Sequence, residues 1–355
     1  MKRIEKREVM KIKNITVLGA GSWGTALGNM LFENGHEVTL WTLSEEHADE
    51  MMKSGCNENY LPGIKLPKGL KINSNIEESM QKAEMIVYAL PSRLAVETLE
   101  RMTPYLTERQ RIISVSKGFE KDGLQRISEV IKEKAPMCKV GVLSGPSHAE
   151  EVAKKIPTAC VASADDGELL EEIQDAFMNS YFRVYTNDDM VGVEIGGALK
   201  NIIALACGIV DGVGWGDNTK AAIITRGMSE IARLGVAMGG NEFTFSGLSG
   251  IGDLIVTCTS VHSRNRRAGI LLGEGKSLEE VLREVKMVVE GVDNAKAAYR
   301  LSEKYKVAMP ITTEVYRILF EGKELKESAR ELMMRDKKSE LEASYKFGIE
   351  DTEYK

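Results

Sequence analysis

Apolar positions follow two different patterns along the chain, and the change between them divides the sequence. From residue 189 onward, apolar residues recur at helical spacing. Before it, helical stretches alternate with short apolar runs of the length of buried strands, at 12–18, 38–41, 83–90, 111–115, 139–143, 158–162 and 182–185. The pattern predicts an α/β domain over residues 1–188, an all-α domain over 189–338 and a polar tail over 339–355 that frays.

A glycine-rich turn follows the first expected strand. Residues 19–24 read Gly-Ala-Gly-Ser-Trp-Gly and connect the strand 12–18 to a helical stretch and a second strand. In a nucleotide-binding turn of this kind, Gly19 permits the tight turn, Gly21 lets a pyrophosphate approach the backbone, and Gly24 lets the helix pack on the strand. The helix N-terminus then faces the phosphates. We predict a doubly wound, Rossmann-type domain that binds a dinucleotide, the alternative being a purely structural turn.

Small, polar or charged residues stand at the carboxyl ends of the later strands, where open α/β sheets bind ligands. One strand ends at Ser116-Lys117-Gly118, and the next ends at Ser144-Gly145-Pro146-Ser147-His148. Lys117 is therefore a candidate site residue, although a solvated turn lysine has the same pattern. We expect His148 to cap or line its loop and not to act as a base.

The stretch 192–208 predicts the central helix of the second half. Thr186 and Asp189, three residues apart, resemble a capping box that would start it, and a glycine-rich turn is expected at 210–217. One stripe of this helix is nearly bare of side chains and consists of Glu194, Gly197, Asn201, Ala204 and Gly208. Because glycine destabilises a helix interior by about 1 kcal/mol, we expect another segment to approach the backbone here.

Lys200 lies beside this bare stripe in a segment otherwise too apolar for an open ammonium. In one interpretation, two helices pack tightly and Lys200 extends its head to the surface. In the other, Lys200 is desolvated and faces a ligand, and burial lowers its pKa from about 10.4 into a range useful for proton transfer. The pattern alone leaves both open.

Two segments further along carry charge at expected helix starts. Asp253 follows a stretch rich in serine and glycine, and either caps its helix or orients Lys200. Residues 263–267 read Ser-Arg-Asn-Arg-Arg, and their guanidinium groups with the helix-start amides can form a phosphate seat. A solvated charged face is the alternative for this cluster.

Composition narrows the class of protein. A length of 355 residues suggests two domains, and 43% hydrophobic with 28% charged residues is typical of a globular protein. The formal net charge of −6 argues against a general nucleic-acid binder, so an anion must be met by a local basic cluster. Five scattered cysteines without metal-site spacing predict free thiols in a reducing cytoplasm and no metal. We find no signal-peptide core at the charged start and no apolar run of about 18 residues.

Seven blocks of the sequence together resemble one family, the bacterial-type NAD(P)-dependent sn-glycerol-3-phosphate dehydrogenases. The resemblance extends from about Lys13 to about Met334. The blocks are Gly19-Ala20-Gly21-Ser22-Trp23-Gly24-Thr25-Ala26-Leu27, Ser116-Lys117-Gly118, Leu143-Ser144-Gly145-Pro146-Ser147, Gly196-Gly197-Ala198-Leu199-Lys200-Asn201, Gly208-Ile209-Val210-Asp211-Gly212, Gly250-Ile251-Gly252-Asp253-Leu254 and Ser263-Arg264-Asn265-Arg266-Arg267.

The resemblance implies that the chain interconverts dihydroxyacetone phosphate and glycerol 3-phosphate with NAD(P)H, supplying phospholipid synthesis, and a homodimer is possible. It implies that Lys200 is the proton acceptor in oxidation, and from the chemistry of a buried lysine we add Lys117 and Asp253 as catalytic residues. The implied substrate contacts are Lys117, Gly145, Ser147, Asp253, Ser263, Arg264 and Asn265, to which we add Lys200 and Asn201 of the central helix. The implied cofactor contacts, besides Gly19, Gly21 and Gly24, are Ser22, Trp23, Lys117, Ala149, Arg264, Val288 and Glu290.

Elementary chemistry agrees with these roles. The nicotinamide transfers the hydride, and the protein positions the carbonyl and protonates its oxygen. Lys200 can supply that proton if burial and Lys117 lower its pKa, while Asp253 and Asn201 fix its direction. The second strand ends in Trp41-Thr42-Leu43-Ser44, with neither an acid nor an arginine to select a cofactor, so we expect both NAD and NADP to be used.

Two other hypotheses stay open at this stage. The chain is either a related dehydrogenase for another phosphorylated or carboxylated alcohol, or a non-catalytic sensor that only binds dinucleotide. The sensor hypothesis explains the glycine turn but gives no role to Lys200 beside its bare stripe.

Overall fold

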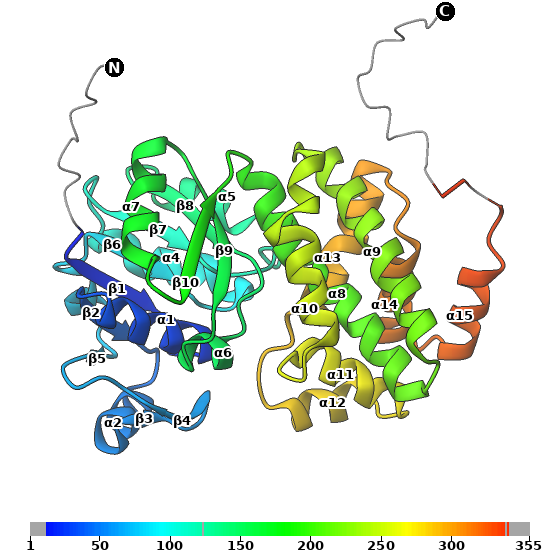
Figure 1. Cartoon of the computed structure of the whole chain (residues 1–355), viewed down its shortest axis with the longest axis horizontal. Coiled ribbons are helices and arrows are strands. Elements are labelled where there is room, and N and C mark those ends of the chain that lie inside the picture. Colours follow the sequence, from blue (N-terminus) through cyan, green and yellow to red (C-terminus); the bar gives the residue numbers. More distant parts are fainter. Residues whose placement is uncertain (1–11, 123, 338, 341–355) are drawn as a thin grey trace, which may run out of the picture.

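The structure, a computed structural model, describes residues 12–122, 124–337, 339 and 340. An α/β half and a helical half lie side by side (Figure 1). The charged start up to residue 11 and the expected frayed tail from residue 341 lie outside the described residues.

Among the described residues, eight strands form one sheet in the order β10-β9-β8-β7-β6-β1-β2-β5. Neighbouring strands are parallel except β8 and β9, and β3 and β4 form a separate antiparallel pair. From β1 the chain goes to β2 on one side and later to β6 on the other, which is the predicted doubly wound arrangement. The strands are β1 Asn14–Leu18, β2 Glu37–Trp41, β3 Cys56–Asn57, β4 Leu61–Lys65, β5 Lys71–Asn73, β6 Met85–Tyr88, β7 Arg111–Ser114, β8 Lys139–Ser144, β9 Thr158–Ala164 and β10 Phe182–Thr186.

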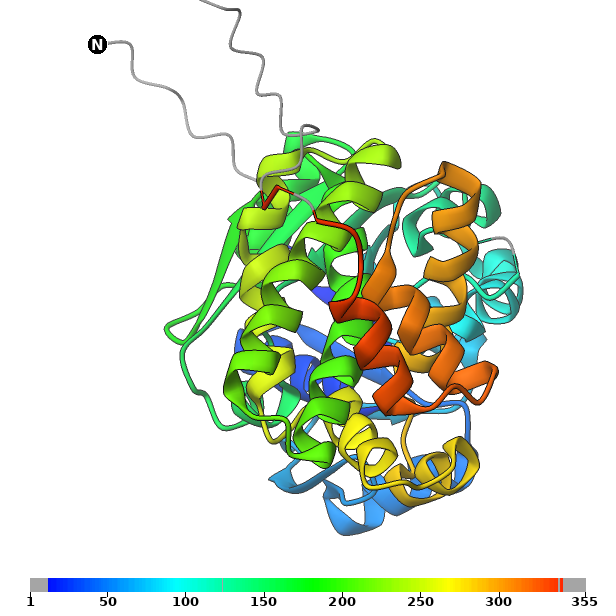
Figure 2. The same cartoon turned by 90° about the vertical axis from the view of Figure 1, so that its right-hand side faces the viewer.

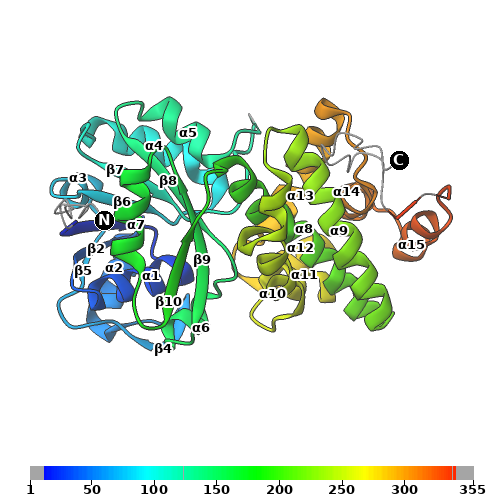
Figure 3. The same cartoon turned by 45° about the horizontal axis from the view of Figure 1, so that its top comes forward.

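Helices cover both faces of this sheet (Figure 3). Leu27 of α1 and Phe177 of α7 belong to the core on one face, and Leu99 of α4 and Ile131 of α5 belong to the core on the other. The helices of this half are α1 Ser22–Glu33, α2 Glu45–Ser54, α3 Ile76–Met80, α4 Ala95–Met102, α5 Ile127–Lys134, α6 Ala149–Ala153 and α7 Gly167–Phe177. Two 3₁₀ turns, Ser92–Leu94 and Thr103–Tyr105, flank α4.

The second half is helical, as predicted, and α8 runs through its core (Figure 2). Its helices are α8 Met190–Val213, α9 Asp217–Ala237, α10 Asp253–Thr259, α11 Arg264–Gly273, α12 Leu278–Val285, α13 Glu290–Tyr305, α14 Pro310–Phe320 and α15 Leu325–Met333. A 3₁₀ turn, Glu242–Ser246, and a π turn, Leu248–Gly252, precede α10.

Both ends of α8 differ from the prediction. The N-cap is Asp189, whose side chain accepts a hydrogen bond from the Gly192 amide at 2.8 Å, while Thr186 ends β10, so the capping box was wrong. The helix also continues through Gly212 and ends at left-handed Gly214, so the expected turn begins later. Gly212 serves a packing contact instead, because a Cβ there would lie 2.2 Å from the Ile270 carbonyl oxygen of α11.

The bare stripe of α8 is covered by two different neighbours. A Cβ at Gly208 would lie 2.1 Å from the Arg266 carbonyl oxygen, so α11 packs backbone against backbone there. Nearer the α/β half, a Cβ at Gly197 would lie 2.7 Å from Ser144 Oγ at the end of β8. The small residues therefore permit helix packing at one end and approach of the sheet loops at the other.

Among the described residues, α8 is the helix long and apolar enough to cross a membrane, with a mean hydropathy of 1.7. However, 94% of its most apolar 18-residue window is buried inside the protein. This burial is typical of the core helix of a folded domain, and packing inside the protein accounts for the apolar composition of α8.

Candidate active site

A cleft of about 430 Å³ lies between the two halves, at the carboxyl ends of β1 and β6. The strand order reverses between these strands, and open α/β sheets bind ligands at such a point. Its lining includes the glycine turn from Gly19 to Trp23, Lys117 after β7, and Lys200 on α8. The opposite wall comes from residues 262–265, Met287, Val288 and Glu290 of the helical half.

The glycine turn has the geometry that a bound pyrophosphate needs. Gly19 has a φ of +112°, and a Cβ at Gly24 would lie only 1.9 Å from the Gly19 carbonyl oxygen. A Cβ at Gly21 would meet nothing within 4 Å, which leaves space in front of the backbone. Gly21 is the N-cap of α1 and supplies no side-chain cap, so the first amides of α1 are available to an anion.

Further groups on the side of the cleft formed by the α/β half fit a dinucleotide. The indole Nε1 of Trp23 is buried and has no hydrogen-bond partner among the described residues. Thr42 and Leu43 line the cleft after β2, and neither repels nor grips a 2′-phosphate. Ala149 begins α6 beside the cleft.

Lys200, Asp253 and Lys117 form one hydrogen-bonded cluster at the floor of the cleft. The Nζ of Lys200 donates to Asp253 Oδ1 and, at 2.7 Å, to Thr257 Oγ1. The Nζ of Lys117 donates to Asp253 Oδ2 and to the Gly145 carbonyl oxygen, both at 2.8 Å. Side-chain exposure is 7% for Lys200 and 1% for Asp253, so Lys200 does not extend to the surface.

Burial controls the charge of this cluster. Burial lowers the pKa of Lys200 to about 7, with help from the positive charge of Lys117 and against the opposing effect of Asp253. Burial alone would raise the pKa of Asp253, but the two lysines outweigh it and lower that pKa below its usual value. An amine that exchanges protons near neutral pH therefore faces a carboxylate that stays ionised.

His148 lines the cleft beside His262, with ring centroids 6.0 Å apart. Burial lowers the pKa of His148 to about 4, and the positive charge of Lys200 adds to the effect. The ring is therefore neutral at physiological pH, in keeping with a lining role.

Asn201 and Asn265 are held by each other and not by Lys200. Asn265 Nδ2 donates to Asn201 Oδ1 at 2.9 Å, and the Gly291 amide donates to Asn265 Oδ1 at 2.9 Å. Asn201 Nδ2 donates to the carbonyl oxygens of Lys117 and Gly197, both at 3.4 Å. The expectation that Asn201 directs Lys200 is corrected, because Asp253 and Thr257 do so.

Of the three arginines predicted to bind a phosphate, one lines the cleft. Arg264, at the start of α11, lines the cleft and donates to the Val288 carbonyl oxygen at 3.2 Å. Arg266 instead pairs with Asp211 at 2.7 Å, and Arg267 is exposed. The helical period separates Arg264 from Arg266, since neighbours at i and i+2 do not share a face. Ser263 caps α11 by accepting from the Arg266 amide at 3.2 Å.

Glu290 connects the two halves across the cleft. It begins α13, and its Oε2 accepts a hydrogen bond from Ser92 Oγ, at the turn after β6, at 2.9 Å. Burial raises the pKa of Glu290, which the Ser92 hydrogen bonds oppose. Asn294, one turn further on α13, donates to the carbonyl oxygens of Lys117 at 3.3 Å and Ala198 at 2.9 Å.

Most of the site residues expected from the sequence line this cleft, and the other three, Gly24, Gly145 and Asp253, contact residues of its lining. Sequence reasoning missed Thr257, Ser92 and Asn294. Thr257 stands four residues after Asp253, a spacing that places both on one helix face and that could have identified it. Ser92 follows the strand that ends at residue 90, a place where polar residues are expected near a ligand, but nothing in the sequence indicated its partner Glu290. Asn294 carries no local signal, because its partners are far away in the sequence.

Comparison with known proteins decides the family. Residues 14–170 match a family model described as NAD-dependent glycerol-3-phosphate dehydrogenase N-terminus, and residues 189–330 match the corresponding C-terminus. The chain belongs to this glycerol-3-phosphate dehydrogenase family.

Relatives of the glycerol-3-phosphate dehydrogenase family match over nearly their whole length. The glycerol-3-phosphate dehydrogenase (NAD(P)+) of Lysinibacillus sphaericus is 56% identical over 334 residues, which are 93% of this chain and 99% of the relative. That of Pelotomaculum thermopropionicum is 53% identical over 331 residues, 92% of this chain and 95% of the relative. A crystal structure of glycerol-3-phosphate dehydrogenase from Coxiella burnetii is 39% identical, with a TM-score of 0.89 over 92% of this chain and 99% of that chain.

Proposed function

We propose that this chain interconverts dihydroxyacetone phosphate and sn-glycerol 3-phosphate with NAD(P)H, and that Lys200 is its general acid and base. The observation that carries the proposal is the position of Lys200, a buried amine with a pKa of about 7 on the cleft floor, opposite the glycine turn. A catalytic acid or base works best when its pKa is near the operating pH.

The α/β half would hold the cofactor. The Gly21 backbone and the first amides of α1 would bind the pyrophosphate, with Trp23 Nε1 as a further donor. Ala149, Val288 and Glu290 would line the remainder of the cofactor site. When bound, the nicotinamide supplies or accepts the hydride.

The lysines and Asp253 would manage the proton. In reduction, the Lys200 ammonium donates a proton to the oxygen that gains negative charge, and in oxidation the neutral amine removes it. Asp253 and Thr257 hold the amine in place through two hydrogen bonds. Lys117 keeps the Lys200 pKa low and also presents a positive charge to the same oxygen.

Arg264, Ser263 and Asn265 would bind the substrate phosphate. They lie together at the start of α11, where a guanidinium and helix-start amides suit an anion. Binding energy from this remote group orients the carbonyl against Lys200. Asn201, held by Asn265, would contact the substrate between the two ends.

The experiment follows reduced-nicotinamide absorbance with dihydroxyacetone phosphate, unphosphorylated dihydroxyacetone or a 2-keto acid. We expect turnover with the phosphorylated ketone and turnover at least about a hundredfold slower with the others, since losing a bound charge weakens the complex by several kcal/mol. Equal rates would contradict the phosphate assignment. No oxidation of the cofactor with any ketone would contradict the catalytic proposal and favour a sensor.

Several wider properties belong to the same proposal. The described cysteines are all free thiols, which supports a reducing, cytoplasmic location. The product is a phosphorylated glycerol of the kind that phospholipid synthesis consumes. The break between β10 and α8 supports the division at residues 188 and 189. A homodimer stays a prediction.

A further inference from the structure

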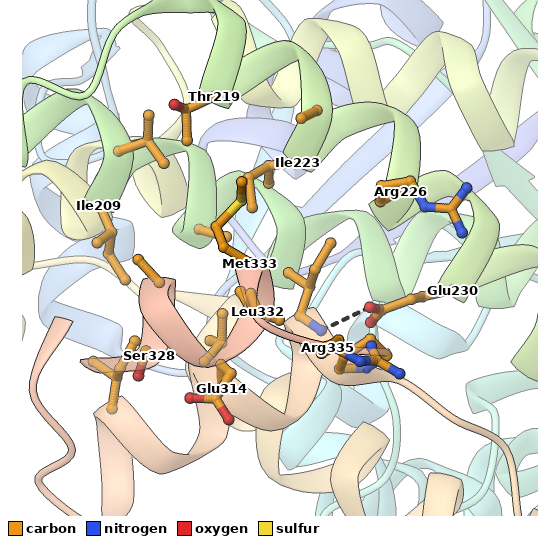
Figure 4. A pocket seen from close by; sticks show the side chains of 18 of the residues that line it. Ile209, Thr219, Ile223, Arg226, Glu230, Glu314, Ser328, Leu332, Met333 and Arg335 are labelled. Atoms are coloured by element: carbon orange, nitrogen blue, oxygen red, sulfur yellow. Dashed lines mark hydrogen bonds between the residues drawn. The ribbon is translucent and has the colours of Figure 1, made fainter. Parts of the chain in front are cut away.

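The two ends of α8 face different neighbours. Towards its C-terminal end, Ile209 and residues of α9, α14 and α15 line a cavity of about 540 Å³ within the helical half (Figure 4). Towards its N-terminal end, Val193 packs against Val142 of β8 and Val161 of β9. The part of α8 that precedes Lys200 therefore carries contacts that set this helix against the sheet.

Glu194 begins the nearly bare stripe of α8, and its carboxylate contacts the α/β half. Its Oε2 accepts a hydrogen bond from Arg126 Nη1 at 2.6 Å, and its Oε1 accepts one from the Ser128 amide at 2.9 Å. The Ser128 hydroxyl also donates to Oε2. The side chains of Glu194 and Arg126 are 8% and 13% exposed, so salt screens this ion pair little. These contacts, which we name the Glu194 anchor, join α8 to the start of α5.

The anchored residues end a segment of the chain that begins with Lys117. Lys117 follows β7, and Arg126 is the N-cap of α5. Between them, Phe119 forms a β-bridge with Arg126, and its side chain is buried in the core of the helical half. Because Arg126 pairs with Phe119, which is two residues from Lys117, the Glu194 anchor supports the backbone that carries Lys117.

The position of Lys117 matters because its charge acts on Lys200. Burial lowers the pKa of Lys200, Asp253 opposes this effect, and the positive charge of Lys117 lowers the pKa further. His148, which also lies beside Lys200, stays neutral because burial lowers its pKa to about 4. If Lys117 moved away from Asp253, its own effect would weaken and the carboxylate would act on Lys200 alone. Both changes raise the pKa of Lys200.

We propose that Glu194 is a positioning residue, which holds Lys117 against Asp253 and Lys200 by anchoring the start of α5 to α8. This inference rests on the proposed function, because it assigns the proton transfer to Lys200. Glu194 acts through the backbone and not through its charge. A direct effect of the charge has the opposite sign, since removing a nearby carboxylate lowers the pKa of an amine.

The first test is the pH dependence of kcat/KM for oxidation of glycerol 3-phosphate by Glu194→Gln. The amide keeps an acceptor for the Ser128 amide, and Glu129 still pairs with Arg126 at 2.9 Å, so we expect this variant to fold. The rise in rate should move to higher pH than in the parent. A rise displaced by one pH unit lowers the rate about tenfold on its acid side. Glu194→Ala should displace the rise further.

Two controls separate positioning from stability. Glu172→Gln breaks the ion pair of Glu172 with Arg111, which is 2.7 Å long, similarly buried and confined to the α/β half. This variant should lose stability to denaturant and keep the parent pH profile. In a Lys117→Ala background, Glu194→Gln should displace the rise no further, because two residues that act through one interaction are not additive.

Amide hydrogen exchange tests the Glu194 anchor without using the reaction. Exchange over residues 117–122 should be about tenfold or more faster in Glu194→Gln than in the parent, since a hydrogen bond to a charged group contributes at least this factor. In Glu172→Gln, exchange over the same residues should equal that of the parent.

Four results would overturn the proposal. They are unchanged exchange over residues 117–122 in Glu194→Gln, an unchanged rise in its pH profile, a rise at lower pH, and full additivity with Lys117→Ala. A parent chain that does not oxidise glycerol 3-phosphate would contradict the proposed function instead. The exchange comparison would then still decide whether Glu194 holds the segment that carries Lys117.

Discussion

Replacing Asp253 by Asn separates the electrostatic account from a purely structural one. The Asp253 carboxylate is 1% exposed and accepts from the ammonium groups of both Lys117 and the buried Lys200, one on each oxygen. An asparagine keeps the shape of the side chain but removes its charge. Its Nδ2 can only donate, so it faces one of the two lysine ammonium groups without accepting a hydrogen bond from it. Breaking a buried ion pair on one side destabilises a protein by about 3–5 kcal/mol. We therefore expect Asp253→Asn to fold with a clearly lowered free energy of unfolding.

The same substitution should change the pH dependence of reduction. Asp253 raises the pKa of Lys200, so its removal lowers that pKa further below about 7. A fall of about one unit in the Lys200 pKa leaves about one-tenth of the lysine protonated at the former midpoint, where half was protonated before. The proton donor for reduction is thus depleted about fivefold or more at neutral pH. Activity relative to the parent should recover as the pH is lowered.

Denaturant unfolding and a pH series of kcat for reduction provide the assay. The matched control is Asp211→Asn, because Asp211 also pairs with two cations, Lys220 and Arg266, but away from the cleft. We expect the control to lose some stability and to keep the parent pH profile. If Asp253→Asn also keeps that profile, the carboxylate does not set the charge of Lys200, and the electrostatic reasoning fails.

Three further predictions follow from the cleft. Arg264→Ala should weaken binding of dihydroxyacetone phosphate by about 2–4 kcal/mol and reduce discrimination against the unphosphorylated ketone. Replacing the exposed Arg267 by Ala should do neither, so equal KM changes in the two variants would refute the assignment of Arg264. NADH and NADPH should give kcat/KM within about tenfold of each other, because the end of the second strand, residues 41–44, contains neither an acid nor an arginine. A preference of about a hundredfold would contradict this prediction. Gly24→Ala should abolish dinucleotide binding measured by calorimetry, because its Cβ would lie 1.9 Å from the Gly19 carbonyl oxygen; normal affinity would contradict the geometry.

Much of the fold was predictable from local pattern. The strand runs and the change of period at residue 189 correspond to observed elements, because both features depend on which residues are buried. The glycine turn was predictable since its residues are contiguous. The ends of α8 were not, because Gly212 has the sequence signal of a turn and is used instead for contact with α11.

The candidate site was predictable as residue types more than as contacts. Lys200 beside a bare stripe indicated a buried amine, but the sequence left open whether it reached the surface. That choice depends on Asp253 and Lys117, whose approach is set by the packing of the two halves. The arginine cluster shows the reverse case. Its residues are adjacent in sequence, but the helix directs Arg266 to Asp211 and Arg264 to the cleft.

The most direct test of the account is the pH dependence of kcat/KM for oxidation of glycerol 3-phosphate, which reports the free enzyme. In the proposed mechanism oxidation needs the neutral amine, so the rate should rise through a pH of about 7 as Lys200 loses its proton. Lys117→Ala should move the rise to higher pH. Lys200→Ala should fold, bind dinucleotide, abolish the rise and lower kcat by about 10²–10⁴-fold. A folded Lys200→Ala enzyme with undiminished kcat would contradict the central claim.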